Sequence, residues 1–151
     1  MAKKIVGVSG IEEVLGEHLG YGPPVLVDQA RIDQFAEATG DHQWIHVDPV
    51  AAAAGPFGAT IAHGMLTVSM GVDLVAGLYE LEGFEMVVNK GLNRVRFMNP
   101  VPVNSSIYGG VCFKQTKSTD KGTELVIEID IKDADGDNLV CVAEFVILLM
   151  G

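Results

Sequence analysis

The sequence predicts an α+β fold in which an antiparallel sheet wraps around one long, buried helix. Short segments with helical periodicity, each bounded by capping and turn residues, occupy the first third of the chain. Residues 60–79, TIAHGMLTVSMGVDLVAGLY, are apolar on nearly every side of a helix. From residue 86 onward the pattern changes to strand-length apolar and alternating segments. A sheet curved around the apolar helix is the simplest way to cover all its faces.

The first predicted element is a short helix. Ser9 followed by Glu12 has the spacing of a capping box. Apolar residues of the segment 11–19 lie on one helical stripe, and Gly20 is expected to end the helix.

Turn and cap residues define the next elements. A brief strand, Val25–Val27, follows a Gly-Pro-Pro turn. Asp28 is expected to cap a second helix, which Gly40 ends in the left-handed conformation. The pair Asp48–Pro49 predicts the start of a small Ala-rich turn, which ends at Gly55 and Pro56. Residues 41–47 between these elements are expected to form an irregular loop.

The long apolar segment is interpreted as a buried helix rather than a membrane span. It contains His63 and Asp73, several glycines and no flanking basic residues. The predicted strands that follow it are Met86–Phe97, Ser106–Lys117, Glu124–Lys132 and Leu139–Leu148.

Composition limits the possible functions. The 151 residues fit a single domain over 1–151. A formal net charge of -10 argues against nucleic-acid binding. With 48% hydrophobic residues, we expect at least a dimer. The N-terminal apolar run is too short and too acidic for a signal peptide, which predicts a cytoplasmic protein. Cys112 and Cys141 have no Cys-x-x-Cys partner and are expected to be buried without a chemical role.

The segment GDHQWIHVDP, residues 40–49, concentrates polar side chains in a largely apolar chain. Asp41 and His46 lie five residues apart, and a carboxylate and an imidazole held together there could share one water as an acid–base pair. The alternative is that Asp41 only bonds backbone amides in a turn and that His46 is a satisfied, half-buried histidine.

The segment IAHGM, residues 61–65, adds a second candidate group. The N-terminus of a helix presents unpaired N–H groups and the positive end of the dipole, so Gly64 N–H is a candidate oxyanion donor. Alternatively, Gly64 relieves crowding against a strand, and His63 bonds a backbone carbonyl.

The histidines of these segments also suggest a metal site as an alternative. His42 and His46 are spaced i, i+4 and, with His63, could form a zinc site. That geometry needs a continuous helix through Trp44, which the Asp48–Pro49 start signal opposes. We therefore expect no metal.

These residues together resemble a known family. The patterns Gly40-Asp41-x-x-x-x-His46-x-Asp48-Pro49 and Ile61-Ala62-His63-Gly64-Met65 are similar to those of the R-specific enoyl-CoA hydratases, also called MaoC-like hydratases. LNRVRFMNPVPV, 92–103, resembles the family's strand and turn after the long helix. The DHQWIHVDP wording is most similar to the nodulation protein N-like branch. In many members Asn-Pro stands where this chain has Gln43 and Trp44, and Val72 replaces a serine that some members carry.

The resemblance implies a hot-dog fold and the reversible syn addition of water to a trans-2-enoyl-CoA, giving an R-3-hydroxyacyl-CoA in fatty-acid metabolism. Asp41 and His46 would hold and activate the water, and Gly64 N–H would stabilise the thioester oxyanion. Gln43, Trp44 and His63 are expected to contact substrate. No cofactor is implied.

Arg94 and Arg96, with Lys90, form the densest basic group for the CoA phosphates; the alternative is solvated charge or dimer salt bridges. A homodimer is also implied. An acyl-CoA thioesterase and a non-catalytic acyl-CoA-binding subunit are the alternative functions.

Overall fold

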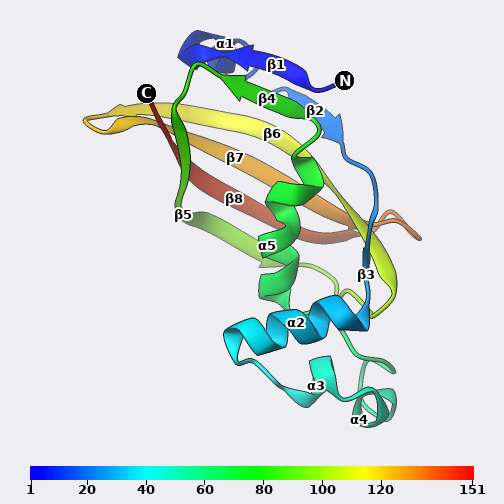
Figure 1. Cartoon of the computed structure of the whole chain (residues 1–151). Helices are drawn as coiled ribbons and strands as arrows, with labels where there is room; N and C mark the ends of the chain where they lie inside the picture. The colour runs from blue at the N-terminus through cyan, green and yellow to red at the C-terminus, as the bar shows by residue number, and fades with distance from the viewer.

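The computed structural model describes residues 1–151, and its dominant feature is a six-stranded sheet curved around helix α5 (Figure 1). The neighbouring strands follow the order β2-β6-β7-β8-β5, and β3 pairs with β6 at the same end. The large strands are β5 (Met86–Phe97), β6 (Ser105–Thr119), β7 (Gly122–Asp133) and β8 (Leu139–Met150), all antiparallel. The predicted α+β class and the antiparallel sheet around a helix are thus confirmed.

The four large strands match their predicted segments closely. β5 has the predicted bounds, and the other three extend beyond them by one to two residues at individual ends. On β7 the isoleucines 127, 129 and 131 are buried, whereas the charged residues between them are part-exposed. This alternation places one face of the sheet against α5 and the other outward.

Helix α5 (Gly64–Val75) is shorter than predicted. Residues 61–63 are extended because their backbone pairs with neighbouring segments: Ile61 N–H donates to Ile45 O and Ala62 N–H to Val101 O. At the other end, Tyr79 begins strand β4 (Tyr79–Glu82). The expectation that the helix is buried on every side is also wrong for the isolated chain, since Met65 and Val72 are exposed.

The N-terminal part also differs from the prediction. Helix α1 spans Gly7–Glu13 and has no side-chain cap, so the capping box of Ser9 and Glu12 does not form. Gly20 lies not at a helix end but inside strand β2 (His18–Tyr21), which pairs with β6. Strand β1 (Lys3–Val6) pairs in parallel with β4 in a separate two-stranded sheet.

The segments that lie below α5 in Figure 1 follow their predicted caps. Strand β3 spans Val25–Val27, as predicted. Helix α2 (Gln29–Thr39) is capped by the Asp28 carboxylate and ends at Gly40, whose φ is 80°. Helix α4 (Pro49–Ala53) is capped by Asp48, which accepts hydrogen bonds from Val50 and Ala51 N–H. Between them, Trp44–Val47 form one helical turn, α3, rather than the expected irregular loop.

A close approach of α5 to the sheet depends on one glycine. A Cβ at Gly109 on β6 would lie 2.9 Å from Leu74 Cβ, so glycine lets the helix pack tightly against this strand. Leu74 and Val75 are buried there among the sheet residues. The core therefore anchors α5 along the sheet, while the N-terminal end of the helix lies next to α2 and α3, since His63 directly before it contacts Phe35 of α2 and His46 of α3 (Figure 1).

The cysteines occupy different environments. Cys141 is buried, as expected, but Cys112 is half-buried. None of the helices is both long and apolar enough to cross a lipid bilayer.

Candidate active site

His46 is held by the short helix α3 and by the extended segment that precedes α5. Its side chain is only 6% exposed. The ring Nδ1 lies 2.7 Å from the carbonyl oxygen of Ile61. Because a carbonyl oxygen can only accept, Nδ1 carries the hydrogen and donates it. In the neutral ring this leaves Nε2 as the free, proton-accepting atom.

His63, the residue before α5, is bonded in the complementary way. Its Nε2 lies 2.9 Å from the backbone oxygen of Asp41, so Nε2 carries the hydrogen. Its Nδ1 is buried and has no hydrogen-bond partner. The His63 ring stacks on that of His46, with 3.9 Å between centroids and 24° between the planes. An unpartnered buried nitrogen is uncommon and identifies a place where a further polar atom would be bound favourably.

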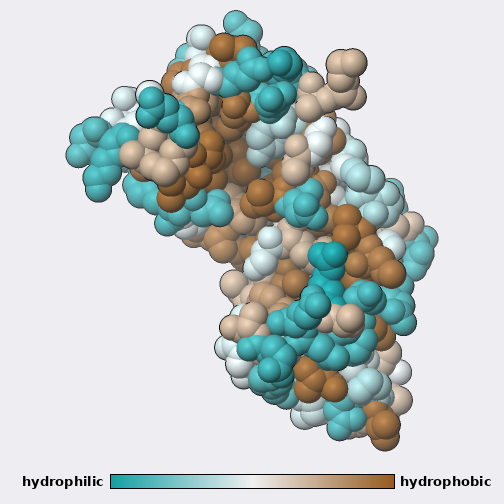
Figure 2. Space-filling model, in the orientation of Figure 1, coloured by the Kyte–Doolittle hydropathy of each residue, from teal (hydrophilic) through white to brown (hydrophobic).

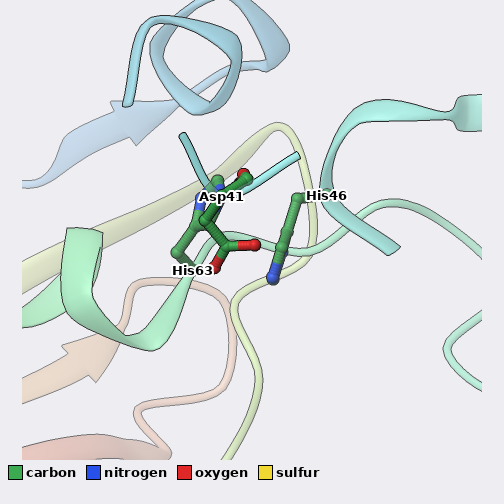
Figure 3. Close-up of side chains that lie close together, drawn as sticks. All are labelled: Asp41, His46 and His63. Atoms are coloured by element: carbon green, nitrogen blue, oxygen red, sulfur yellow. The ribbon is translucent and has the colours of Figure 1, made fainter. Parts of the chain in front are cut away.

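The third residue of this cluster, Asp41, lies beside the two histidines. It follows the left-handed Gly40, and its Oδ1 accepts a hydrogen bond from Gln43 N–H at 3.3 Å. One side-chain ligand atom of each of Asp41, His46 and His63 lies within 4.8 Å of the others. Figure 3 shows the Asp41 carboxylate and the His46 ring reaching toward the same space. The fold therefore brings together Asp41 and His46, the acid and the imidazole that the sequence suggests as a pair.

The same three residues form the chain's candidate metal-ligand group, but their orientation fits a metal poorly. A histidine binds a metal through a lone pair in the plane of its ring. The two rings stack with nearly parallel planes, so their lone pairs do not converge on one ion without a rotation of one ring. The residues present thus suit proton transfer better than metal binding.

Gly64 is the first residue of α5, and its N–H donates to no protein group. Gly64 and His46 line the same pocket, whose volume is about 340 Å³. Most of its other lining is apolar and comes from the loops around residues 57–62 and 97–101, with Thr67 and Val140. Gly64, whose N–H is unpaired, thus lines an apolar pocket at the positive end of the α5 dipole, where a developing negative charge would be stabilised.

The structural contacts that were the alternative interpretation of Asp41, His63 and Gly64 are also found in the structure. Asp41 does bond a turn amide, and His63 does bond a backbone carbonyl. A Cβ at Gly64 would lie 2.9–3.1 Å from ring atoms of Phe97, so Gly64 also relieves crowding against β5. The contacts of Asp41 and His63 each use only one polar side-chain atom, and the contact of Gly64 uses none, so the remaining polar atoms stay free for chemistry.

Other predicted site residues lie farther from the pocket. Gln43 is exposed at the N-terminal end of α3, without a side-chain cap bond. Trp44 is 44% exposed, and its ring atoms lie 2.9 Å from where a Cβ of Gly55 would be, so it packs on the end of α4. The side chain of His42 turns to Glu37 Oε1, at 2.7 Å, and this bond raises the pKa of His42.

Arg94 and Arg96 line a different pocket on the outer side of the sheet, together with Glu128 and Glu144. Arg94 on β5 lies opposite Glu144 on β8 in the register of the two strands. Met98 lines both this pocket and the one that contains His46. The structure therefore places the two arginines near one end of the candidate site but not inside it.

Three residues at the site were not anticipated from the sequence. Thr67, one turn after Gly64, is 3% exposed and lines the pocket, and the i, i+3 spacing from Gly64 could have indicated it. Gln29 and Thr60 bond each other 31 positions apart, and no local pattern signals that contact.

Comparisons with known proteins agree with this geometry. The family model described as "MaoC like domain" matches residues 11–132. The chain is 38% identical over 141 residues to 3-hydroxyacyl-thioester dehydratase Z of Mycobacterium tuberculosis, covering 93% of each chain. It is 36% identical over 149 residues to nodulation protein N of Rhizobium meliloti, covering 93% of this chain and 92% of the relative.

A solved structure shows the same fold. The (R)-hydratase from A. caviae involved in PHA biosynthesis superimposes with a TM-score of 0.71 at 24% identity, covering 89% of this chain and 96% of that one. The resemblance inferred from the sequence motifs is thereby confirmed. The chain belongs to the family of MaoC-like dehydratases, which are hydro-lyases, and it has their hot-dog fold.

Proposed function

We propose that this protein is an R-specific enoyl-CoA hydratase, which adds water reversibly to a trans-2-enoyl-CoA. The observation that carries the proposal is the meeting of three groups. His46 and Gly64, whose N–H is unpaired, line one apolar pocket, and a carboxylate oxygen of Asp41 lies within 4.8 Å of a ring nitrogen of His46. The names of the relatives, a 3-hydroxyacyl-thioester dehydratase and an (R)-hydratase, support the same class of reaction.

In the proposed reaction, a water held by Asp41 and His46 forms a bond from its oxygen to C3 of the substrate. One proton of that water passes to the Asp41–His46 pair, and the pair returns a proton to C2. Electron density moves through the enolate to the thioester oxygen, where Gly64 N–H donates a hydrogen bond. A single acid–base pair lies on one face of the substrate, which accounts for syn addition. The two groups are expected to act as one unit in this proton transfer.

The test is hydration of crotonyl-CoA with chiral analysis of the product. Asp41→Asn and His46→Ala should each lower kcat by about 10²–10⁴-fold, because each removes a proton-transfer group. His42→Ala is the matched control, since His42 lies in the same segment but is exposed and bonded to Glu37. An S product, or full activity in both site variants, would contradict the proposal. Release of free thiol from saturated acyl-CoA would identify a thioesterase instead.

We also propose a homodimer formed through β5. This strand is at the edge of the sheet, and its outer edge has no partner strand. Apolar side chains exposed on β5 include Met86, Val87, Val88 and Leu92. Figure 2 shows apolar residues gathered across the middle of the face on which α5 lies. An exposed apolar edge favours pairing with a second copy. Sedimentation should give a dimer, and Leu92→Lys should shift it toward the monomer; a monomeric wild-type protein would contradict this.

The arginines of the outer pocket are proposed to contact the CoA phosphates. Met98 lines both their pocket and the one that contains His46, so the two pockets are neighbours and one molecule could place its acyl part in one and its nucleotide part in the other. Replacing Arg94 and Arg96 by alanine should raise KM for crotonyl-CoA but not for the N-acetylcysteamine thioester, which lacks phosphates. An equal change with both substrates would exclude phosphate contact.

A further inference from the structure

The side-chain amide of Gln29 makes three hydrogen bonds at the start of α2. Its Nε2 donates to the backbone oxygen of His46 at 2.7 Å and to Asp33 Oδ1 at 2.8 Å. Its Oε1 accepts from Thr60 Oγ1 at 2.5 Å. A carbonyl and a carboxylate only accept, so the NH₂ group must face His46 and Asp33, and the orientation of the amide is fixed.

Thr60 belongs to the segment that holds the His46 ring. It is 1% exposed, and its carbonyl accepts from Val103 N–H at 2.8 Å. The next residue, Ile61, donates its N–H to Ile45 O at 3.0 Å and accepts the Nδ1–H of His46 at 2.7 Å. The Gln29–Thr60 bond therefore links the contact on the His46 backbone to the contact on its ring.

The helix that carries His46 needs such support. α3 has four residues and no side-chain cap, which is far too short for a helix to be stable by itself. The His46 carbonyl has no partner within the helix, and Gln29 provides one. The direction of the His46 ring is consequently set by contacts from outside α3.

We infer that Gln29 and Thr60 are positioning residues that keep His46 Nε2 directed into the pocket. The inference rests on the proposed hydratase function of Asp41 and His46. Neither residue needs to touch substrate, because both act through His46. A shift of about 1 Å in a catalytic group can lower a rate by about 100-fold. Loss of either partner should therefore lower kcat by about 10–100-fold and change KM little.

The decisive variants are Thr60→Val and Thr60→Ser. Valine has nearly the same shape as threonine but lacks the hydroxyl donor, whereas serine keeps the donor and loses one methyl group. Thr60→Val should lower kcat as stated, and Thr60→Ser should restore most of it. Gln29→Met should act like Thr60→Val. Gln34→Met, an exposed position on the same helix, is the matched control and should leave kcat and KM unchanged.

All variants are first compared by thermal unfolding, and kinetics are measured on those that are folded at the assay temperature. If Gln29→Met fails to fold, the Thr60 pair still decides. A folded Thr60→Val with kcat within about twofold of wild type would overturn the inference. So would a loss in Thr60→Ser as large as that in Thr60→Val, since the hydroxyl would then not be the cause.

A second measurement does not depend on activity. Nitrogen-15 spectra of the imidazoles should show His46 protonated on Nδ1 in the wild type. In Gln29→Met the His46 signals should shift or broaden, while those of exposed His18 and His42 stay unchanged. Unchanged His46 signals would refute the positioning role. If the wild-type protein hydrates no enoyl thioester, the proposed function fails, and these spectra still test the positioning role.

Discussion

The role proposed for Gly64 can be tested by replacing it with proline. Proline removes the N–H and is favoured at the first position of a helix, where no intrahelical bond is lost. Gly64 occupies this position in α5, and its N–H has no protein partner. His63 has φ -59° and ψ 139°, the extended conformation that a residue before proline prefers. The substitution should therefore leave the backbone in place.

Alanine is the matched control, because it keeps the N–H while adding a Cβ at the same point. That Cβ would lie 2.9–3.1 Å from the ring of Phe97 in either variant. The ring is the end of a flexible side chain that is 51% exposed, so it can move aside. The difference between the two variants thus isolates the N–H group.

Removal of one oxyanion donor costs about 10²–10³-fold in kcat, or about 2.7–4 kcal/mol. We expect Gly64→Pro to lose this much relative to Gly64→Ala in hydration of crotonyl-CoA at saturating substrate. Thermal unfolding should show both variants folded. If the two variants have the same kcat, Gly64 serves only to make room for Phe97, and the oxyanion donor lies elsewhere.

Three further predictions concern stability and ionisation. Burial raises the pKa of Cys141 to about 11, so at pH 8 a thiol reagent should label only Cys112 in the native protein and both after unfolding; rapid native labelling of Cys141 would contradict this. Glu37→Gln should lower the pKa of His42 in an NMR titration, because the Glu37 hydrogen bond raises it. Because the pKa of His42 is higher in the folded state, the contact stabilises the protein below pH 6.5, and this stabilisation is lost as the pH rises through the folded-state pKa. An unchanged pKa of His42 in Glu37→Gln would exclude the contact. Asp48→Ala should reduce the free energy of unfolding, measured by denaturant curves, by about 1 kcal/mol, because it removes the cap of α4. Asp48→Asn is the control, since asparagine also caps helices; an equal loss in both variants would show that capping is not the cause.

Local signals in the sequence predicted much of the fold. The caps at Asp28, Gly40 and Asp48 act through neighbouring backbone groups, so their spacing alone places them. The alternation of the long strands has the same local character. The end of β5 could be predicted because the proline-containing turn NPVPVN, 99–104, follows it closely.

The predicted helix and strand bounds are wrong where hydrogen bonds to distant parts of the backbone decide the conformation. Ile61 and Ala62 are as apolar as the helix that follows, so the periodicity could not distinguish a helix from an extended segment here. Their conformation comes from pairing with Ile45 and Val101, from opposite directions along the chain. Strands β1 and β4, each four residues long, pair in parallel across more than 70 positions, for which a single sequence carries no signal.

The candidate site shows the same division. Asp41, His46 and Gly64 were found because their residue types suit acid–base chemistry and anion binding. The contacts that direct His46 could not be predicted, because in the sequence Gln29 and Thr60 are two ordinary polar residues 31 positions apart, with no sign that they bond each other. The resemblance to a family identified the reacting groups but not their supports in this chain.

The structure also shows why the structural and catalytic interpretations of these residues were not exclusive. An imidazole has two nitrogens, and His46 and His63 each use one of them to satisfy a backbone carbonyl. That bond assigns the proton to one nitrogen and leaves the other as the acceptor. For His46 the structural bond is therefore a condition of the proposed chemistry, because without it the proton could occupy the nitrogen that must accept one. A histidine that looks satisfied in the core can for this reason be the better candidate for a base.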